Sequence, residues 1–169
     1  LFSRQPPTRP SSRRMSSMGY VTMVSLLDVN VLVALFDPAH IHHEAAHEWF
    51  GASGASGWAT CPLTENGLVR VISNPAYPGR RTTVADAVDR LRRFTESDGH
   101  VFWADDVSLL DTRSIDASHV SGHREITDVY LLALAAHRGE ALATFDMNIR
   151  SGAVPGAGKE HLTVISAKR

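Results

Sequence analysis

The stretch LLDVNVLVALFD, residues 26–37, is almost wholly apolar, yet Asp28 stands near its start and Asn30 two positions later. A buried carboxylate is costly unless a hydrogen bond or a cation compensates its charge. Asp28 therefore predicts a compensating partner, such as a cation, where a buried strand ends. For Asn30 two interpretations stay open: it orients Asp28, or it caps the helix that follows.

Around this stretch, short apolar runs alternate with amphipathic segments from Val24 onward, which is typical of an α/β fold with a parallel sheet flanked by helices. Strands are predicted over residues 23–29, 57–61, 100–104, 141–145 and 161–166. Helices are predicted from about residue 30 and over residues 40–53, 62–73, 82–97 and 126–139. Thr64 and Thr127 are expected to cap the starts of two of these helices.

The composition limits the class of protein. The chain has 169 residues and is 43% hydrophobic, which is enough for one domain with a sizeable core. Its formal net charge of -1 gives no global attraction to polyanions, so nucleic acid must be met by local basic patches. Cys61 is the one cysteine, which excludes an internal disulfide and a cysteine-based zinc site of the usual kind. This usage is typical of a cytoplasmic protein.

The N-terminal segment and the length of the apolar runs limit the organisation of the chain further. Residues 1–22 are rich in proline, serine and arginine, and we expect a disordered extension or a start assigned too far upstream. One domain is expected over residues 23–169. No apolar run approaches the roughly 18 residues that a membrane span needs, so no membrane association is expected.

Four carboxylates occupy related places in the predicted sheet. Asp28 and Asp146 follow strands, and Glu65 and Asp128 stand in the first turns of helices. Each has a simpler explanation, because the helix dipole favours a first-turn carboxylate by roughly 0.3–1 kcal/mol and an aspartate after a strand often forms a turn. Together, however, they predict one acidic pocket at the carboxyl ends of the strands.

A cluster of carboxylates needs compensation, because like charges raise one another's pKa. Mg²⁺ or Mn²⁺ provides it, since these ions prefer oxygen ligands and keep several waters. Such an ion can orient a phosphodiester and lower the pKa of a bound water. The four acids therefore indicate hydrolysis of a phosphate ester.

Four segments resemble the acidic motifs of PIN-domain ribonucleases, in particular the VapC-type toxins of bacterial toxin-antitoxin pairs. These segments are LLDVNVLVALFD, PLTENGLVRV, HREITDVYLLALAAHRG and LATFD. By position, the family's metal-binding acids match Asp28, Glu65, Asp128 and Asp146, and its supporting polar residues match Asn30 and Thr144. Relatives often carry another acidic or polar residue where Met147 and Asn148 stand, so a second metal is less expected than a first.

The resemblance implies a PIN-like α/β/α sandwich and an endoribonuclease toxin that uses Mg²⁺ or Mn²⁺ to hydrolyse structured RNA, such as tRNA or rRNA loops. The products would carry 5′-phosphate and 3′-hydroxyl ends. A small VapB-like antitoxin is the implied partner, and a homodimer is expected. We expect the antitoxin to lie in a groove lined by VLVALF, AAHEWF and VADAVDRLRRF. The alternative is a catalytically silent PIN fold that binds RNA or protein.

Basic side chains suggest a further site, for contacts with RNA. Arg80, Arg81, His123 and Arg124 are candidates for contacts with RNA phosphates, although exposed arginines commonly serve solubility alone.

His43 and His47 have the spacing of a zinc pair, but no third ligand stands nearby, so an exposed helix face is the default interpretation. Trp49, Trp58 and Trp103 are expected in the core rather than against bases.

Overall fold

The computed structural model describes residues 23–166 and contains a five-stranded sheet in the order β3-β2-β1-β4-β5. All four neighbouring pairs are parallel. The strands are β1 (Ser25–Leu27), β2 (Trp58–Thr60), β3 (His100–Phe102), β4 (Ala141–Thr144) and β5 (Leu162–Val164). The predicted parallel sheet is confirmed, but its strands are shorter than predicted. Val29, for example, is apolar and yet begins a helix, so apolar character alone extended the first strand too far.

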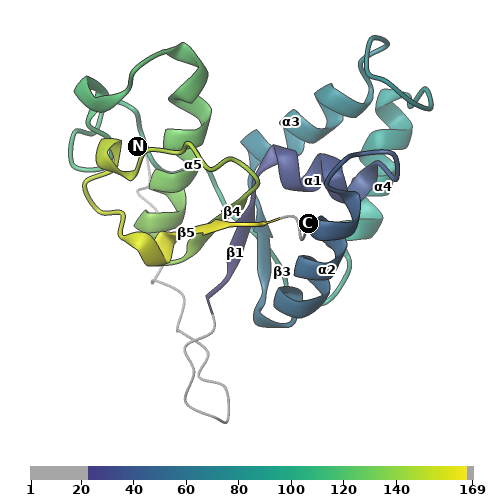
Figure 1. Cartoon of the computed structure of the whole chain (residues 1–169), viewed down its shortest axis with the longest axis horizontal. Helices are drawn as coiled ribbons and strands as arrows, with labels where there is room; N and C mark the ends of the chain where they lie inside the picture. Colours follow the sequence, from purple (N-terminus) through teal and green to yellow (C-terminus); the bar gives the residue numbers. More distant parts are fainter. Residues whose placement is uncertain (1–22, 167–169) are drawn as a thin grey trace, which may run out of the picture.

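Within residues 23–166, five α-helices lie between β1 and β4. They are α1 (Val29–Phe36), α2 (His43–Ser53), α3 (Pro62–Ile72), α4 (Val84–Thr95) and α5 (Ile126–His137). Helices α1 to α4 lie on one side of the sheet, and α5 lies on the other with the segments that follow β4 (Figure 1). The arrangement is the predicted α/β/α sandwich.

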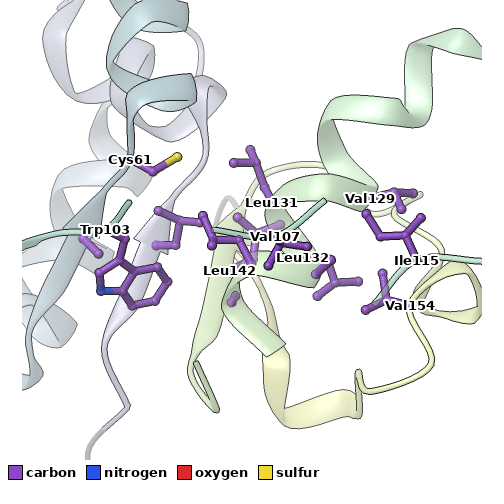
Figure 2. Close-up of a cluster of buried hydrophobic side chains, with 14 of the residues drawn as sticks. Cys61, Trp103, Val107, Ile115, Val129, Leu131, Leu132, Leu142 and Val154 are labelled. Atoms are coloured by element: carbon purple, nitrogen blue, oxygen red, sulfur yellow. The ribbon is translucent and has the colours of Figure 1, made fainter. Parts of the chain in front are cut away.

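Alternation along the strands separates two cores, because successive side chains of a strand point to opposite faces. Leu26 and Leu142 belong to the cluster beneath α5, whereas Leu27 and Ala143 belong to the cluster beneath α1 to α4. Figure 2 shows the first cluster, in which Leu131 and Leu132 of α5 lie near Leu142 and Trp103 approaches from the other side. The sheet is therefore covered on both faces, which explains why its strands read as continuous apolar runs.

The three tryptophans serve the core, as predicted. Trp58 and Trp103 are buried, and Trp49 packs against the core from a half-buried position. The indoles of Trp58 and Trp103 therefore offer no open face for stacking on a base.

The starts of α3 and α5 differ from the prediction. Cys61, not Thr64, is the N-cap of α3, and Pro62 occupies the first helical position, where its missing N–H leaves no donor unpaired. The Thr64 hydroxyl instead bonds the backbone of Cys61. In α5 the N-cap is Glu125, so Thr127 lies inside the helix. Glu65 and Asp128 nevertheless stand in the first turns, as predicted.

Gly67 lets α3 pack closely on α1. A Cβ atom at this position would lie 2.5 Å from Cγ2 of Val29, which is closer than van der Waals contact allows. The absence of a side chain at Gly67 therefore fixes how near the start of α3, with Glu65, comes to the start of α1.

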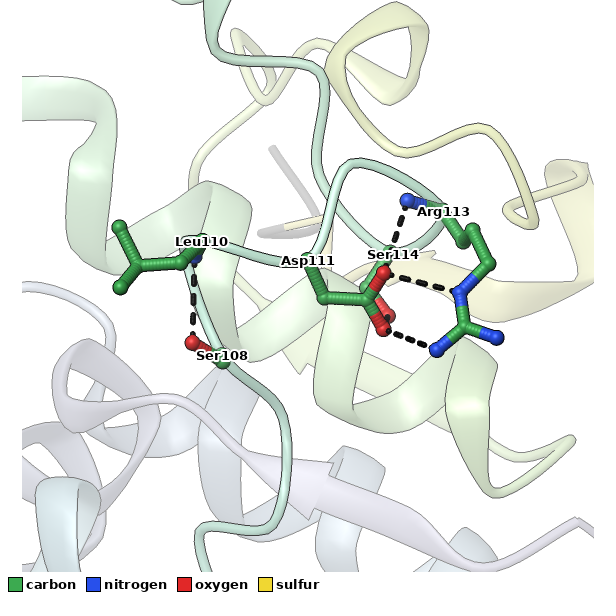
Figure 3. Close-up of polar contacts among 5 residues, drawn as sticks. All are labelled: Ser108, Leu110, Asp111, Arg113 and Ser114. Carbon is green, nitrogen blue, oxygen red and sulfur yellow. Dashed lines mark hydrogen bonds and ion pairs between the residues drawn. The ribbon is translucent and has the colours of Figure 1, made fainter.

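A long connection joins β3 to α5 and is held by local bonds. Figure 3 shows Asp111 accepting hydrogen bonds from the backbone N–H of Arg113 at 3.1 Å and from its guanidinium at 3.0 and 3.1 Å, while the Leu110 N–H donates to Ser108. The Arg113 side chain is 90% exposed, so this ion pair orders the turn more than it stabilises the fold. Across residues 23–166, no helix is long and apolar enough to span a membrane.

Candidate acidic site at the sheet edge

The acidic residues gather where the strand order reverses. From β1 the chain moves outward to β2 and β3, and it then returns across the sheet to β4 beside β1. In open parallel sheets, a crevice for ligands forms outside the carboxyl ends of the strands at this point. Asp28 directly follows β1, and Asp146 comes two residues after β4. The topology therefore places the two strand-end acids at the expected position for a site.

A dense hydrogen-bond network holds Asp28, which is only 4% exposed. The Thr144 hydroxyl donates to Asp28 Oδ2 at 2.7 Å, and the Asn30 amide donates to the same oxygen at 2.8 Å. Asn30 also donates to Thr144 Oγ1 at 2.9 Å and accepts from the Phe145 N–H at 3.1 Å. Asn30 thus orients Asp28 and does not cap α1, which settles the two interpretations of this residue. Both predicted supporting residues contact the acid.

Electrostatics link three of the four acids. Burial raises the pKa of Asp28, and the charge of Asp146 raises it further, although the hydrogen bond from Thr144 opposes this shift. Burial also raises the pKa of Asp128 to about 6, with further contributions from the charges of Asp28 and Asp146. Asp28, Asp128 and Asp146 therefore form a single group of interacting carboxylates, called here the acidic triad.

Asp146 combines two of the interpretations considered for it. Its Oδ1 accepts the Asn148 N–H at 2.7 Å, which is the predicted turn after a strand, and its own N–H donates to Thr144 Oγ1 at 3.0 Å. Since the turn bond falls on Oδ1, it fixes the carboxylate while the charge still acts on Asp28 and Asp128. The turn therefore positions the acid and does not replace its role in the triad.

Glu65 is held from the β2 side of the site. Its Oε1 accepts the Thr60 hydroxyl at 2.7 Å. The structure therefore brings three predicted acids together and holds the fourth on the β2 side of the site.

Sequence reasoning missed Thr60 and the residue behind it, His100, whose Nε2 lies 2.8 Å from Thr60 Oγ1. A local signal was present for Thr60. The strands β2 and β4 read WAT and ALAT, so each ends in Ala-Thr, and the second threonine was already a candidate. No local signal marks His100.

The donor chemistry of the triad fits a hard divalent cation. Within residues 23–166, no group of three or more His, Cys, Asp or Glu side chains is arranged so that it could hold a metal ion directly. Mg²⁺ and Mn²⁺, however, are commonly bound through one or two carboxylates and keep several waters. Burial is the largest cause of the raised pKa values of Asp28 and Asp128, and the charges of neighbouring carboxylates add to it. A hydrated divalent ion is the chemistry that this arrangement suits.

The histidine pair contacts the C-terminal end of α1. Nδ1 of His43 lies 2.8 Å from the Ala34 carbonyl oxygen, and Nε2 of His47 lies 3.1 Å from that of Leu35. Each of these two nitrogens therefore carries a proton that it donates to a carbonyl oxygen. The two rings bind the carbonyl end of α1, so they serve to hold α2 against α1 rather than simply facing solvent.

The candidate RNA contacts separate into two places. His123 and Arg124 are exposed in the turn that precedes α5, just before Asp128. Arg80 and Arg81 instead line a cavity of about 670 Å³ at the other end of α1, with Phe36 and Tyr77 among its walls. Asp28 and the cavity lie at opposite ends of α1, whose eight residues span roughly 12 Å at about 1.5 Å per residue.

The predicted groove along VLVALF is wrong as stated. All six residues from Val31 to Phe36 are buried, at 0 to 8% exposure, because both the sheet and the neighbouring helices cover α1. Phe36, at the end of α1, does reach the cavity that Arg80 and Arg81 line. An apolar segment can therefore meet α1 at its C-terminal end and not along its length.

Comparison with known proteins agrees with this architecture. The PIN domain family matches residues 25–154. Ribonuclease VapC44 of Mycobacterium tuberculosis (strain ATCC 25618 / H37Rv) is 48% identical over 143 residues, which cover 85% of this chain and 100% of that protein. Ribonuclease VapC39 of the same strain is 47% identical over 134 residues, covering 79% and 96% respectively. Ribonuclease VapC29 is 38% identical over 127 residues, covering 75% and 89%.

A parallel α/β/α sandwich with carboxylates at its switch point defines the class as a PIN-fold nuclease. The chain belongs to the PIN-domain family and, within it, to the VapC ribonucleases. It is accordingly an endoribonuclease of a toxin-antitoxin system.

Proposed function

We propose that this ribonuclease cleaves structured RNA by hydrolysis that depends on Mg²⁺ or Mn²⁺, with Asp28, Asp128, Asp146 and Glu65 as the acids that hold the ion directly or through its bound waters. The observation that carries the proposal is the grouping of Asp28, Asp128 and Asp146 at the sheet edge, where Thr144 and Asn30 fix the Asp28 carboxylate and the charges of these acids act on one another. A fold tolerates such uncompensated charge when a cation relieves it during function.

The divalent ion would lower the pKa of a bound water and neutralise charge that develops on the phosphate. Asp28 would hold the ion most firmly, because its carboxylate is fixed by Thr144 and Asn30. Asp128, with a pKa of about 6, and Asp146 complete the acidic surface. Glu65 would act from the β2 side, where Thr60 holds it.

Basic residues near the site support contacts with the RNA backbone. His123 and Arg124 precede the helix that carries Asp128, so we propose that they meet phosphates beside the scissile bond. Arg80 and Arg81 line the more distant cavity, which suits phosphates further along a structured RNA such as a tRNA or rRNA loop. Because phosphate contacts carry little sequence information, these residues set affinity rather than the target sequence.

A VapB-like antitoxin is the proposed partner. The cavity of about 670 Å³ combines Phe36, Ile72 and Tyr77 with exposed polar groups, which supports docking of an amphipathic segment by spaced apolar anchors. The triad would attract an arginine of that segment, since a guanidinium can hold carboxylates bidentately. Such a side chain would supply the positive charge that the cation otherwise supplies, and it would thereby inhibit.

We further propose a homodimer and an N-terminal extension. The edge strand β3 exposes Val101 and Phe102 at 44% and 54%, and an exposed apolar edge favours association. Light scattering coupled to gel filtration measures the dimer directly.

Residues 1–22 lie outside the described residues, and we propose that the catalytic domain spans residues 23–169, so that a chain beginning at Met23 retains nuclease activity.

The decisive experiment incubates the purified chain with total cellular RNA in Mg²⁺, in Mn²⁺ and in excess EDTA, and sequences the new RNA ends. Cleavage with either metal and none in EDTA is expected, with products that carry 5′-phosphate and 3′-hydroxyl ends. Undiminished cleavage in EDTA would contradict a metal-dependent mechanism. The sequenced ends also identify the RNA target.

A second experiment tests the toxin role in cells. Expression of the chain alone should stop growth, and co-expression with the small protein encoded beside it should restore growth. Soluble, folded protein that is harmless when expressed alone and cleaves no RNA in vitro would favour a silent binding module instead.

A further inference from the structure

A hydrogen-bonded chain of three side chains ends on Glu65. The Thr60 hydroxyl lies 2.7 Å from Glu65 Oε1, and Nε2 of His100 lies 2.8 Å from the same hydroxyl oxygen. Thr60 is fully buried as the last residue of β2, and His100 is half-buried as the first residue of β3. The pairing of β2 with β3 places Trp58 opposite His100, so the sheet register itself brings His100 to this face.

The direction of the chain follows from counting protons. A threonine hydroxyl has one proton, and here it is donated to the Glu65 carboxylate. His100 must therefore donate to the hydroxyl oxygen, which requires its proton on Nε2. Burial lowers the pKa of His100, while the charge of Glu65 opposes that shift. The imidazole is thus a neutral donor of fixed tautomer, and the chain runs from His100 through Thr60 to Glu65.

Packing holds the donor in place. The His100 ring lies against the Trp58 indole with centroids 4.5 Å apart, and the indole N–H bonds the Asp98 carbonyl oxygen at 3.3 Å. Trp58 is itself buried. The imidazole therefore has a rigid wall behind it, and the orientation of its Nε2 depends on the β2–β3 pair rather than on solvent.

The hydrogen-bonded series from His100 through Thr60 uses one oxygen of the Glu65 carboxylate. In the part of the protein that the structure describes, the hydrogen bond to the Glu65 side chain falls on Oε1, which leaves Oε2 for a ligand. Partners of this kind orient metal-binding side chains and raise their affinity, and their loss typically costs about 10–100-fold in metal affinity or activity.

We propose that His100 and Thr60 are positioning residues that hold Glu65 for the divalent cation at the acidic site. The proposal rests on the proposed function, because it assumes that Glu65 is a ligand of that cation. It assigns a role to two residues that touch neither the cation nor the RNA. It also explains why two polar side chains, Thr60 and His100, meet in the otherwise apolar β2–β3 pair.

Matched substitutions test the proposal through the dissociation constant of Mn²⁺, measured by calorimetry on the full chain without RNA. Thr60→Val removes the hydroxyl at nearly constant volume, and Thr60→Ser keeps it. His100→Phe keeps a ring against Trp58 without a donor, and His100→Gln keeps an N–H at a position similar to Nε2. We expect Thr60→Val and His100→Phe to weaken Mn²⁺ binding about 10–100-fold, and Thr60→Ser and His100→Gln to stay within about threefold of the wild type by the same reasoning.

The controls distinguish failure of the positioning role from failure of the proposed metal site on which it rests. If Asp128→Asn weakens Mn²⁺ binding but Thr60→Val and His100→Phe do not, the positioning role is overturned while the metal site stands. If the folded wild-type chain binds no Mn²⁺, the metal site itself is overturned, and the positioning role with it. Should Thr60→Val fail to fold, His100→Phe against His100→Gln decides alone, because these changes leave the end of β2 intact.

Discussion

Thr144 and Thr60 each end a strand beside the site, one on the β4 side and one on the β2 side, but their hydrogen-bond partners differ. Thr144 closes β4 and donates to Asp28, and Thr60 closes β2 and donates to Glu65, both at 2.7 Å. Both threonines are fully buried. Thr144 also accepts from the Asn30 amide and from the Asp146 N–H, whereas Thr60 accepts from His100.

The difference lies in the charge that each hydroxyl serves. On the β4 side, Asp28 belongs to a triad in which burial, and to a smaller extent the charges of neighbouring acids, raises the pKa of two members. On the β2 side, a neutral imidazole and a hydroxyl support one carboxylate. The comparison teaches that one half brings together buried carboxylates that repel one another, whereas the other half holds a single carboxylate in a fixed orientation.

Removing the charge of an acid should give the largest measurable difference between the β4 side and the β2 side of the site. Asp128→Asn and Glu65→Gln should each lower RNA cleavage by on the order of a hundredfold or more, because each deletes a proposed ligand rather than a partner of one. In metal-free buffer, however, only Asp128→Asn should raise the melting temperature, since it alone relieves repulsion within the triad. Cleavage assays and thermal melts in EDTA measure both effects. A higher melting temperature for Glu65→Gln would show that Glu65 shares the repulsion.

Removing the hydroxyl of Thr144 or of Thr60 should lower the free energy of unfolding by different amounts. Thr144→Val deletes a donor to the buried Asp28 and leaves two donors without their acceptor, so we expect a loss of about 2–3 kcal/mol in the free energy of unfolding. Thr60→Val deletes one donor and one acceptor at a half-buried carboxylate, and the expected loss is about 1 kcal/mol. Urea denaturation measures both. Equal losses would mean that the denser network at Thr144 adds no stability.

The packing between α1 and α3 sets the distance between the halves. Gly67→Ala should destabilise the fold even though alanine favours a helix by about 1 kcal/mol, because its Cβ would lie 2.5 Å from Val29 Cγ2 and overpacking costs about 1–3 kcal/mol. A net loss of up to about 2 kcal/mol follows from these two values. A more stable Gly67→Ala variant would show that α1 and α3 separate freely.

The pH dependence of stability sharpens the contrast without mutation. The pKa of Asp128 is raised from 3.8 to about 6 in the folded chain, so the folded state binds this proton more tightly than the unfolded state does. Its contribution to stability is therefore complete below about pH 4 and is lost as the pH rises through about 6. Metal-free melts of the wild type and of Asp128→Asn should converge below about pH 4, separate between about pH 4 and 6, and keep a constant difference above about pH 6. A difference that does not change between about pH 4 and 6 would contradict the raised pKa.

The smallest effect is expected at the histidines on the far side of α1. His43→Gln with His47→Gln should leave cleavage within about twofold of the wild type, because both rings bind carbonyls of α1 and an amide N–H can replace them. The same RNA assay measures this. A loss as large as that of Asp128→Asn would make the pair part of the site.

Much of the site was readable from local pattern. Asp28 interrupts an apolar run, and Glu65 and Asp128 were expected in first turns, where they stand. The caps were predicted less well, because Pro62 moved the start of α3 and Thr127 lies inside α5. The groove along α1 was wrong because an apolar segment looks the same whether it lines a groove or fills a core, and only packing shows that residues 31–36 are buried.

The sequence by itself determined which side chains could bind a cation and the order of strands and helices that carries them, because periodicity and the spacing of polar residues are local properties. Tertiary structure decided which of these side chains meet. Thr144 reaches Asp28 across 116 positions, and His100 reaches Thr60 across 40. Those contacts depend on strand order and register, which arise when helices bury both faces of the sheet at once, and no short segment of the chain encodes that arrangement.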